Sequence, residues 1–415
     1  MRILVLTQRL PYAPNRGDRL RVYHMLHYLR HHADVELVSL VHDDEEASHV
    51  DDVRAFVSRV SALRVSKLRS GINAAAALVT GTPLTHALLD APGMTATLQS
   101  ICDNHPPDVV FAYGSGMARF AMQPPLDRIP LVLDFVDVDS RKWRDLADAG
   151  MPPKSWIYRR EAATLGAFEA RAAEQAVTSL VVNEREADNA RALTPAVNVK
   201  VLANGVELER LRPPGSPIVS PRVVFCGVMS YEPNAAGMTW FVEQVWPLVR
   251  ASRPDATLAV VGPDPSPAFR ALCETDSSIT VAGRVPDVRD WLWGAAVGIA
   301  PLHVARGVQN KALEAIAAGL PIVITEAVAG GLPPAAAAAS LVANTPPQFA
   351  AHITDLLAKP ASERRAMAAR SDLSGLTWAR TLEPLFSILE RAAAPVRFQT
   401  AAASRVTNEP RLHSA

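Results

Sequence analysis

Short apolar runs, separated by stretches with helical periodicity, recur through the first half of this chain of 415 residues. The runs are Ile3–Thr7, Val35–Val41, Val109–Tyr113, Leu131–Asp134, Leu180–Val182 and Lys200–Leu202. Near-continuous apolar runs fit strands that are buried on both faces, as parallel sheets covered by helices require. The alternation therefore predicts an α/β fold with parallel sheets.

A second series of strands follows a break rich in proline. The break, Glu209–Pro221, contains four prolines, which interrupt helices and cannot donate to a sheet. The second series is Val223–Phe225, Thr257–Val261, Ile279–Ala282, Val297–Ala300, Ile322–Ile324 and Leu341–Val342. We expect a first domain over residues 1–204, a linker over 205–221, a second domain over 222–377 and a disordered tail over 395–415.

Composition excludes several classes of protein. The formal net charge is +0, which argues against a generally basic nucleic-acid binder. The three cysteines are far apart and odd in number, so they favour reduced thiols and a cytoplasmic location over a disulfide framework. The apolar start of the chain is too short for a signal peptide, and no run of 18 apolar residues predicts a membrane span.

The segment Arg306–Thr325 reads as a glycine turn, a short helix and a buried strand. Asn310, Lys311 and Glu314 share one face of the helix, because residues three and four apart are neighbours. A carboxylate accepts hydrogen bonds and can take two from a vicinal diol, so Glu314 is a candidate for binding a sugar. The alternative is an ordinary helical ion pair between Lys311 and Glu314 on a solvated face.

This segment closely resembles the signature of family 4 glycosyltransferases, retaining enzymes of the GT-B fold that use nucleotide-sugar donors. In that family a helical Glu is followed by Ala-X-Ala-X-Gly-X-Pro and an apolar strand, as Glu314 is here. The resemblance implies two Rossmann-like domains that face each other across a cleft, and it assigns Glu314 to the ribose hydroxyls. The family's second Glu, which touches the transferred sugar, is replaced by Arg306. A cation there suggests contact with phosphate or with an acidic sugar.

The same resemblance covers the end of the first domain and the end of the chain. Asn204-Gly205-Val206-Glu207 matches the turn that precedes the linker in family 4, and we expect Gly205 to have a positive φ. The amphipathic segment 378–392 corresponds to the last helix of the family, which crosses back onto the first domain.

Family members clamp the donor diphosphate with an Arg and a Lys, and both are absent from Phe225–Asn234. Arg306 and Lys311 could replace that charge, with the backbone N–H groups of Gly307 and Val308 completing the anion site. The turn that contains Val285 corresponds to the one whose backbone reads the nucleotide base in the family, with a purely structural turn as the equal alternative.

The loop after the first strand corresponds to the family's glycine loop, which contacts the donor diphosphate or the acceptor. Gly17 matches that glycine by position, and Arg16 is the best candidate for a phosphate contact. Arg19 and Arg21 could also meet phosphate or an anionic membrane, or they could be salt-paired at the start of a helix.

The block Asp134–Trp143 places several carboxylates just after a predicted strand. Alternation puts Asp137 and Asp139 on one side, where we expect them to bind sugar hydroxyls and orient the acceptor. Capping of the next helix by Asp139 or Ser140 is the alternative. A Mg²⁺ site is weakly supported, and we expect no cofactor and no protein-bound metal. The block resembles a subgroup of family 4 associated with PEP-CTERM exopolysaccharide systems.

The resemblance implies a retaining glycosyltransferase, which we expect to move a sugar from a nucleotide-sugar donor to a growing exopolysaccharide or lipid-linked glycan. Asp137, Asp139, Arg306 and Lys311 are its candidate catalytic residues. We expect a cytoplasmic protein that contacts the inner membrane surface peripherally. Nucleic acid is not an expected partner. A GT-B sugar-nucleotide epimerase and a non-catalytic nucleotide- or glycan-binding module remain alternatives.

Overall fold

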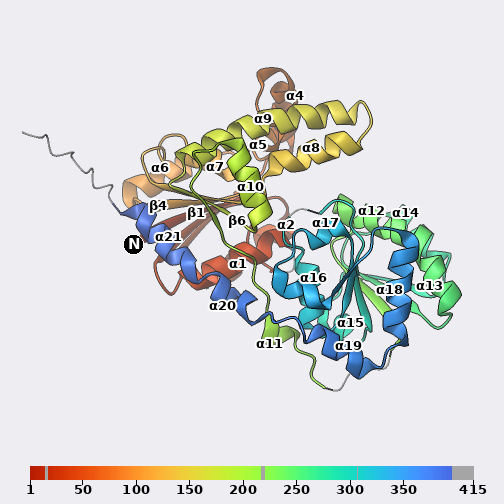
Figure 1. Ribbon diagram of the computed structural model, residues 1–415. Helices are drawn as coiled ribbons and strands as arrows, with labels where there is room; N and C mark the ends of the chain where they lie inside the picture. Colours follow the sequence, from red (N-terminus) through yellow and green to blue (C-terminus); the bar gives the residue numbers. More distant parts are fainter. Residues whose placement is uncertain (15–16, 216–219, 306, 395–415) are drawn as a thin grey trace, which may run out of the picture.

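The computed structural model describes residues 1–14, 17–215, 220–305 and 307–394. Within these ranges the chain forms two parallel sheets, each flanked by helices and each in its own half of the sequence (Figure 1). This arrangement confirms the predicted fold of two Rossmann-like α/β units.

The first sheet has the strand order β3-β2-β1-β4-β5-β6-β7 among the described residues. Strand β4 is fully buried because helices cover both faces of the sheet, as its unbroken apolar sequence predicts. The strands are β1 (Arg2–Thr7), β2 (Asp34–Val41), β3 (Arg59–Arg64), β4 (Val109–Tyr113), β5 (Leu131–Val136), β6 (Thr178–Val181) and β7 (Val199–Val201).

Strand β3 is the one strand of this sheet that the apolar pattern missed. It lies at the edge of the sheet, pairs with β2 and has the sequence RVSALR, with both ends exposed. An edge strand need not be apolar, because one side of its backbone has no neighbouring strand to bury it.

The second sheet has the order β10-β9-β8-β11-β12-β13 in the described part of the chain. Every predicted strand of this half is present within one or two residues of its expected ends. The strands are β8 (Arg222–Cys226), β9 (Thr257–Val261), β10 (Ile279–Gly283), β11 (Val297–Ala300), β12 (Ile322–Ile324) and β13 (Ser340–Val342).

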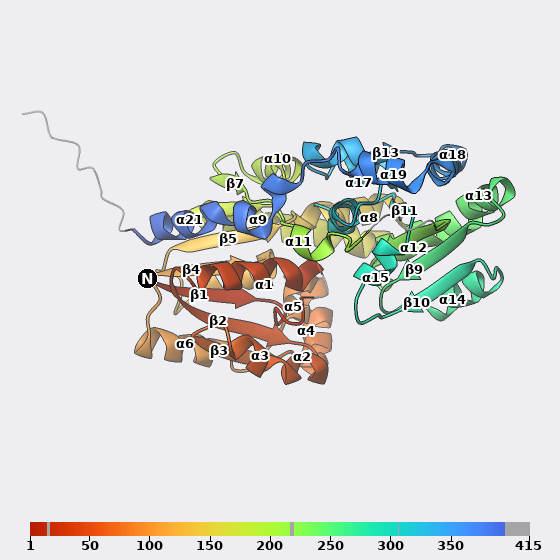
Figure 2. The same cartoon turned by 90° about the horizontal axis from the view of Figure 1, so that it is seen from below.

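The helices connect these strands and cover the sheets (Figure 2). Those of the first half are α1 (Gly17–Leu29), α2 (Asp44–Ser48), α3 (Val50–Arg54), α4 (Lys67–Thr80), α5 (Leu84–Leu88), α6 (Met94–Asn104), α7 (Ser115–Ala121), α8 (Asp139–Ala149), α9 (Lys154–Gln175) and α10 (Glu184–Leu193). Those of the linker and second half are α11 (Leu208–Leu211), α12 (Glu232–Trp240), the π-helix η1 (Phe241–Val245), α13 (Trp246–Ser252), α14 (Pro267–Glu274), α15 (Arg289–Trp293), α16 (Asn310–Ala317), α17 (Glu326–Ala329), α18 (Pro346–Ala358) and α19 (Ala361–Ala368), with two 3₁₀ turns, η2 (Pro334–Ala339) and η3 (Ser374–Leu376).

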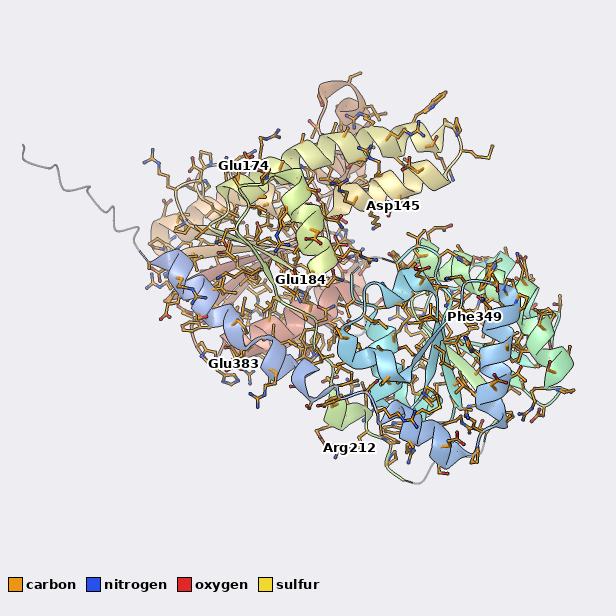
Figure 3. The ribbon with its side chains drawn as sticks, in the orientation of Figure 1. Asp145, Glu174, Glu184, Arg212, Phe349 and Glu383 are labelled. Atoms are coloured by element: carbon orange, nitrogen blue, oxygen red, sulfur yellow. The ribbon has the colours of Figure 1, made fainter. Side chains whose placement is uncertain are left out.

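The last two helices, α20 (Trp378–Thr381) and α21 (Glu383–Ala393), return to the first half of the chain. Their inner face, which includes Trp378, Leu385 and Ile388, joins the hydrophobic core that contains β1 and α1. Figure 3 marks Glu383 at the start of α21, beside the first sheet and away from the second. The end of the chain therefore ties the two sheets together.

Gly205 does not have the positive φ that we expected. The reason for glycine at this position is close packing, because a Cβ here would lie 2.5 Å from the backbone N and Cα of Trp378. The prediction was wrong because the returning helix, which is distant in sequence, imposes the constraint.

Both sheets change winding direction between two central strands, β1 and β4 in the first and β8 and β11 in the second. Ligands of open α/β sheets bind outside the carboxyl ends of the strands at such a switch point. In the second sheet this position is flanked by the loop after β8, starting at Gly227, and by the loop that leads from β11 to α16. In the described ranges no helix is long and apolar enough to cross a membrane.

Candidate functional site

Helix α16 presents the polar face that the sequence predicts. Ala312, Leu313 and Ile316 are buried in the core of the second half, whereas Lys311 and Glu314 are half-buried on the other side. Gln309 precedes the helix with extended backbone angles, and Gly307 has a φ of 60°. The glycine turn therefore directs the helix start, with its partial positive charge, toward the switch point of the second sheet.

The ammonium group of Lys311 reaches the loop after β8. Its Nζ donates to Asn234 Oδ1 at 2.7 Å and to Gln309 Oε1 at 3.2 Å, and it lies 5.5 Å from the centre of the Phe225 ring. Asn234 is held in turn by a hydrogen bond from its Nδ2 to the Val228 carbonyl, 2.8 Å away. Lys311 thus places its positive charge in the segment Phe225–Asn234, which has no lysine or arginine of its own.

Burial shifts the pKa values of both charged groups on α16. It lowers the pKa of Lys311 to about 8, against the opposing effect of Glu314. Burial also raises the pKa of Glu314, an effect that the charge of Lys311 opposes. Each group therefore stabilises the charged form of the other, and the pair differs from an exposed ion pair on a solvated helix.

Asp137 approaches the same region from the first half of the chain. It follows β5, and its carboxylate packs so closely against Gly307 that a side chain at Gly307 would collide with it. Among the described residues, the buried Asp137 Oδ1 has no hydrogen-bond partner. Because an unpaired buried carboxylate oxygen is costly, this atom is a natural place for a ligand hydroxyl.

Asp139, Glu169 and Glu186 form an acidic cluster behind Asp137. Burial is the main cause that raises the pKa of Asp137 to about 7 and of Glu169 to about 8, and Asp139 raises both further. Burial also raises the pKa of Asp139. Val138 occupies the N-cap position of α8, so Asp139 and Ser140 lie inside the helix and the capping alternative is wrong.

The elevated pKa of Asp137 predicts a pH dependence of stability. The folded state holds the Asp137 proton up to about pH 7, whereas the unfolded chain releases it near pH 4, so the stability contributed by the protonated form is lost as pH rises between these values. We expect Asp137→Asn to show a smaller loss of unfolding free energy between pH 5 and 8 than the wild type. Denaturant titrations at several pH values measure it, and Asp148→Asn, on the exposed end of α8, is the control. Parallel pH curves for wild type and Asp137→Asn would contradict the assignment.

Arg185 crosses from the first half to the second half. It lies at the start of α10, next to Glu184, which Figure 3 marks facing the second half of the chain. Its Nη2 donates to the Ala305 carbonyl at 2.9 Å, one residue before Arg306. Two more cations contact the opposite half of the chain. Arg284 pairs with Glu45 at 3.0 Å, and Lys142 lies 5.9 Å from the Tyr231 ring centre.

A buried chain of polar groups connects the first sheet to the start of α16. Arg21, which is fully buried, donates through Nε to Asp134 Oδ2 and through Nη1 to Asn204 Oδ1, both at 2.9 Å. Asn204 Nδ2 then donates to Asn310 Oδ1 at 3.1 Å. Asn310 is the first residue of α16, so this chain sets the position of the helix that carries Lys311 and Glu314.

For the other predicted donor-binding residues the structure gives a position but no contact that indicates a ligand. Val308 packs at the border of the second core, as does Val285, which follows β10. Gly17 is the first residue of α1. The predictions for Arg16 and Arg306 fall outside the described residues.

For the two other arginines near the start of α1, the structure favours the salt-paired alternative. Arg19 Nη2 and Arg9 Nη1 both contact Glu46 Oε1 at 2.5 Å, and Arg21 is bound to Asp134. Arg9 and Arg19 therefore stabilise the first half of the chain, whereas Arg21 also reaches α16 indirectly through Asn204.

Sequence reasoning missed Arg185, Asn234 and the roles of Arg21 and Asn204. Arg185 follows the carboxyl end of one predicted strand by three residues, and Asn234 follows that of another by nine, on the side where ligand-binding residues concentrate in open α/β sheets. That position was a usable signal for both. The pairing of Arg21 with Asp134 has no local signal, since 113 residues separate them.

The second half of the chain resembles a known family. Residues 220–359 match the sequence profile described as "Glycosyl transferases group 1". These residues contain α16 and the loop after β8. No match was found among curated protein sequences.

Solved structures share the fold over nearly the whole chain. Sucrose-phosphate synthase from Thermosynechococcus elongatus superposes with a TM-score of 0.71 at 15% identity, covering 94% of this chain and 99% of that one. HepE from Anabaena, solved with UDP, gives 0.64 at 13% identity, with coverages of 94% and 100%. WaaG, described as a glycosyltransferase involved in lipopolysaccharide biosynthesis, gives 0.62 at 17% identity, with coverages of 94% and 98%.

Proposed function

We propose that the chain, which has a GT-B fold, is a group 1 glycosyltransferase that transfers one sugar from a nucleotide diphosphate donor to a growing glycan with retention of anomeric configuration. The class of enzyme agrees with the sequence prediction. The observation that carries the proposal is the Lys311–Glu314 pair on α16, held at the switch point of the second sheet with Asp137 packed against the adjoining turn.

We assign Glu314 to the ribose and Lys311 to the diphosphate of the donor. A carboxylate can accept both hydrogen bonds of a vicinal diol, and an ammonium group stabilises the negative charge that develops on a departing diphosphate. The backbone N–H groups of Gly307 and Val308 lie just before α16 and supplement that charge. HepE was solved with UDP-glucose, so uridine diphosphate sugars are the first donors to test.

We assign Asp137 to the transferred sugar or to the acceptor hydroxyl. Its unpartnered Oδ1 can accept a hydrogen bond from a sugar hydroxyl, which would fix the orientation of the reacting groups. With a pKa of about 7, Asp137 is protonated in part at neutral pH. A phosphate oxygen of the leaving group takes the acceptor's proton in this proposal, and no protein nucleophile is required.

The acceptor in this proposal is an exopolysaccharide or another lipid-linked glycan, as the similarity of the Asp134–Trp143 block to the PEP-CTERM-associated subgroup implies. A lipid-linked acceptor would place the enzyme at the cytoplasmic face of the inner membrane. Binding to the membrane surface would bring the enzyme to such an acceptor.

The test compares the wild type with Glu314→Gln, a change of similar size that removes the charge. Loss of charge-assisted hydrogen bonds to the ribose is expected to raise KM for the donor roughly 10- to 100-fold. Transfer and hydrolysis of UDP-, GDP- and ADP-sugars are measured, with Glu243→Gln, an exposed change in the same half of the chain, as the control. An unchanged KM in Glu314→Gln would overturn the ribose assignment. Donor epimerisation without transfer would favour an epimerase, and nucleotide binding without turnover would favour a binding module.

A further inference from the structure

Helix α4 has its apolar side turned outward. Leu68, Ile72, Ala75, Ala76 and Val79 are all exposed and follow the spacing of one helix face. Ile72 is 62% exposed and Val79 is 88% exposed. The opposite face, with the buried Ser70 and Ala77, provides the contact to the rest of the protein. Surface helices normally bury their apolar stripe, so an exposed stripe of this kind indicates a binding surface for another molecule.

A second exposed apolar group lies beside the carboxyl end of α4. It comprises Met151, Trp156 and Ile157, at the turn between α8 and α9, and Trp156 is 63% exposed. One helical turn later, Arg160 donates through Nη2 to the carbonyls of Ala77 and Thr82, which closes α4 against α9. Figure 1 shows α4, α5, α8 and α9 gathered at one end of the first half of the chain. We call the two groups together the apolar tip.

The two segments that carry the apolar tip are rich in cations, although Arg69 and Arg159 also lie 3.0 and 4.0 Å from Asp90 and Asp148. Residues 67–80 and 151–160 contain five lysines and arginines and no aspartate or glutamate, although the chain as a whole has a formal net charge of +0. Arg69, Lys154 and Arg159 are exposed at its rim. A second copy docking on the same face would bring like charges together, which opposes a symmetric dimer there.

We propose that the apolar tip binds the surface of a membrane containing anionic phospholipids, with the α4 stripe and Trp156 inserted at the level of the headgroups. The combination of an apolar helix face, a tryptophan and surrounding cations is typical of helices that lie in the membrane interface. Anionic headgroups would pair with Lys154 and would add to the negative charge that Asp90 and Asp148 already place beside Arg69 and Arg159.

The link between this membrane site and a lipid-linked acceptor rests on the proposed function. Helix α8 begins at Asp139, beside Asp137, and ends at Ala149, just before the apolar tip. Its length of 11 residues corresponds to about 16 Å. A membrane at the apolar tip would therefore hold a lipid-linked acceptor within about one short helix of the candidate site.

The experiment is co-sedimentation of the full-length protein with vesicles of phosphatidylcholine alone or mixed with phosphatidylglycerol. We expect the wild type to bind the mixed vesicles and to bind phosphatidylcholine alone much more weakly. Ile72→Gln combined with Val79→Gln keeps good helix formers on an exposed face and should weaken binding on the order of tenfold or more. The control, Leu248→Gln with Val342→Gln, removes exposed apolar groups from the second half and should bind like the wild type.

A third variant, Lys154→Gln with Arg159→Gln, should lose the preference for phosphatidylglycerol and make binding less sensitive to salt. Vesicle binding that the α4 variant does not reduce would overturn the proposal. A dimer in light scattering that the same variant dissociates would assign the face to a second copy of the chain. Donor hydrolysis is measured in parallel without vesicles. If hydrolysis is absent while vesicle binding depends on α4, the result contradicts the proposed function but supports the membrane-binding site.

Discussion

Replacing Lys311 with methionine is expected to lower kcat/KM for sugar transfer by roughly 10²- to 10³-fold, the usual effect of removing a preorganised positive group from a developing negative charge. Methionine keeps the apolar stem of the side chain but removes the ammonium group that contacts Asn234. The loss should be large because Lys311 places its ammonium group beside the loop after β8, where we propose that the donor diphosphate binds. Most of it should fall on kcat, since the charge of the diphosphate grows in the transition state.

Steady-state kinetics with the preferred donor measure this prediction. Lys359→Met, at an exposed lysine that pairs with Glu363 in the same half of the chain, should leave kcat/KM within twofold or so of the wild type. Because the pKa of Lys311 is about 8, wild-type activity should also decline as pH rises above that value, and the decline should vanish in Lys311→Arg if that variant is active. Retention of full activity by Lys311→Met would remove Lys311 from the mechanism.

Arg21→Met is expected to destabilise the first half of the chain by about 3–5 kcal/mol, because the change leaves a fully buried carboxylate on Asp134 without its partner. It also frees Asn204, whose other hydrogen bond holds the first residue of α16. A fold that survives should therefore show weaker donor binding as well as lower stability.

Denaturant unfolding followed by circular dichroism measures the loss, with separate transitions assigned if the two halves do not unfold together. Arg2→Met is the control, because its ion pair with Asp34 is exposed and should contribute at most about 1 kcal/mol. If the single variant fails to fold, Arg21→Met combined with Asp134→Leu should recover folded protein, since no buried charge then remains unpaired. Similar stability of Arg21→Met and the wild type would contradict the role of this pair.

The α/β fold and the face of α16 followed directly from local pattern. Apolar runs such as Val109–Tyr113 could only be buried strands, and the spacing of Lys311 and Glu314 put both on one side of a helix. Strand β3 was not predicted from the sequence, because an edge strand needs no apolar run. The role of Gly205 was misjudged because the packing of Trp378, more than 170 residues away, decides it.

The candidate site could be predicted in parts but not assembled. Nothing in the sequence places Asp137 against Gly307, or brings Arg185 to the carbonyl of Ala305. These contacts join segments more than 100 residues apart and depend on how the two sheets are held by the linker and by α21. Likewise, only the packing of α4 shows that its apolar side faces outward.

Local sequence was enough to predict every strand except β3, because hydrophobic periodicity and glycine or proline breaks act over a few residues. It also determined which side chains on α16 are available for chemistry. Tertiary structure alone decided their partners and their ionisation. The pKa of Asp137 and of Lys311 depends first on burial, and burial is created by segments that are distant along the chain.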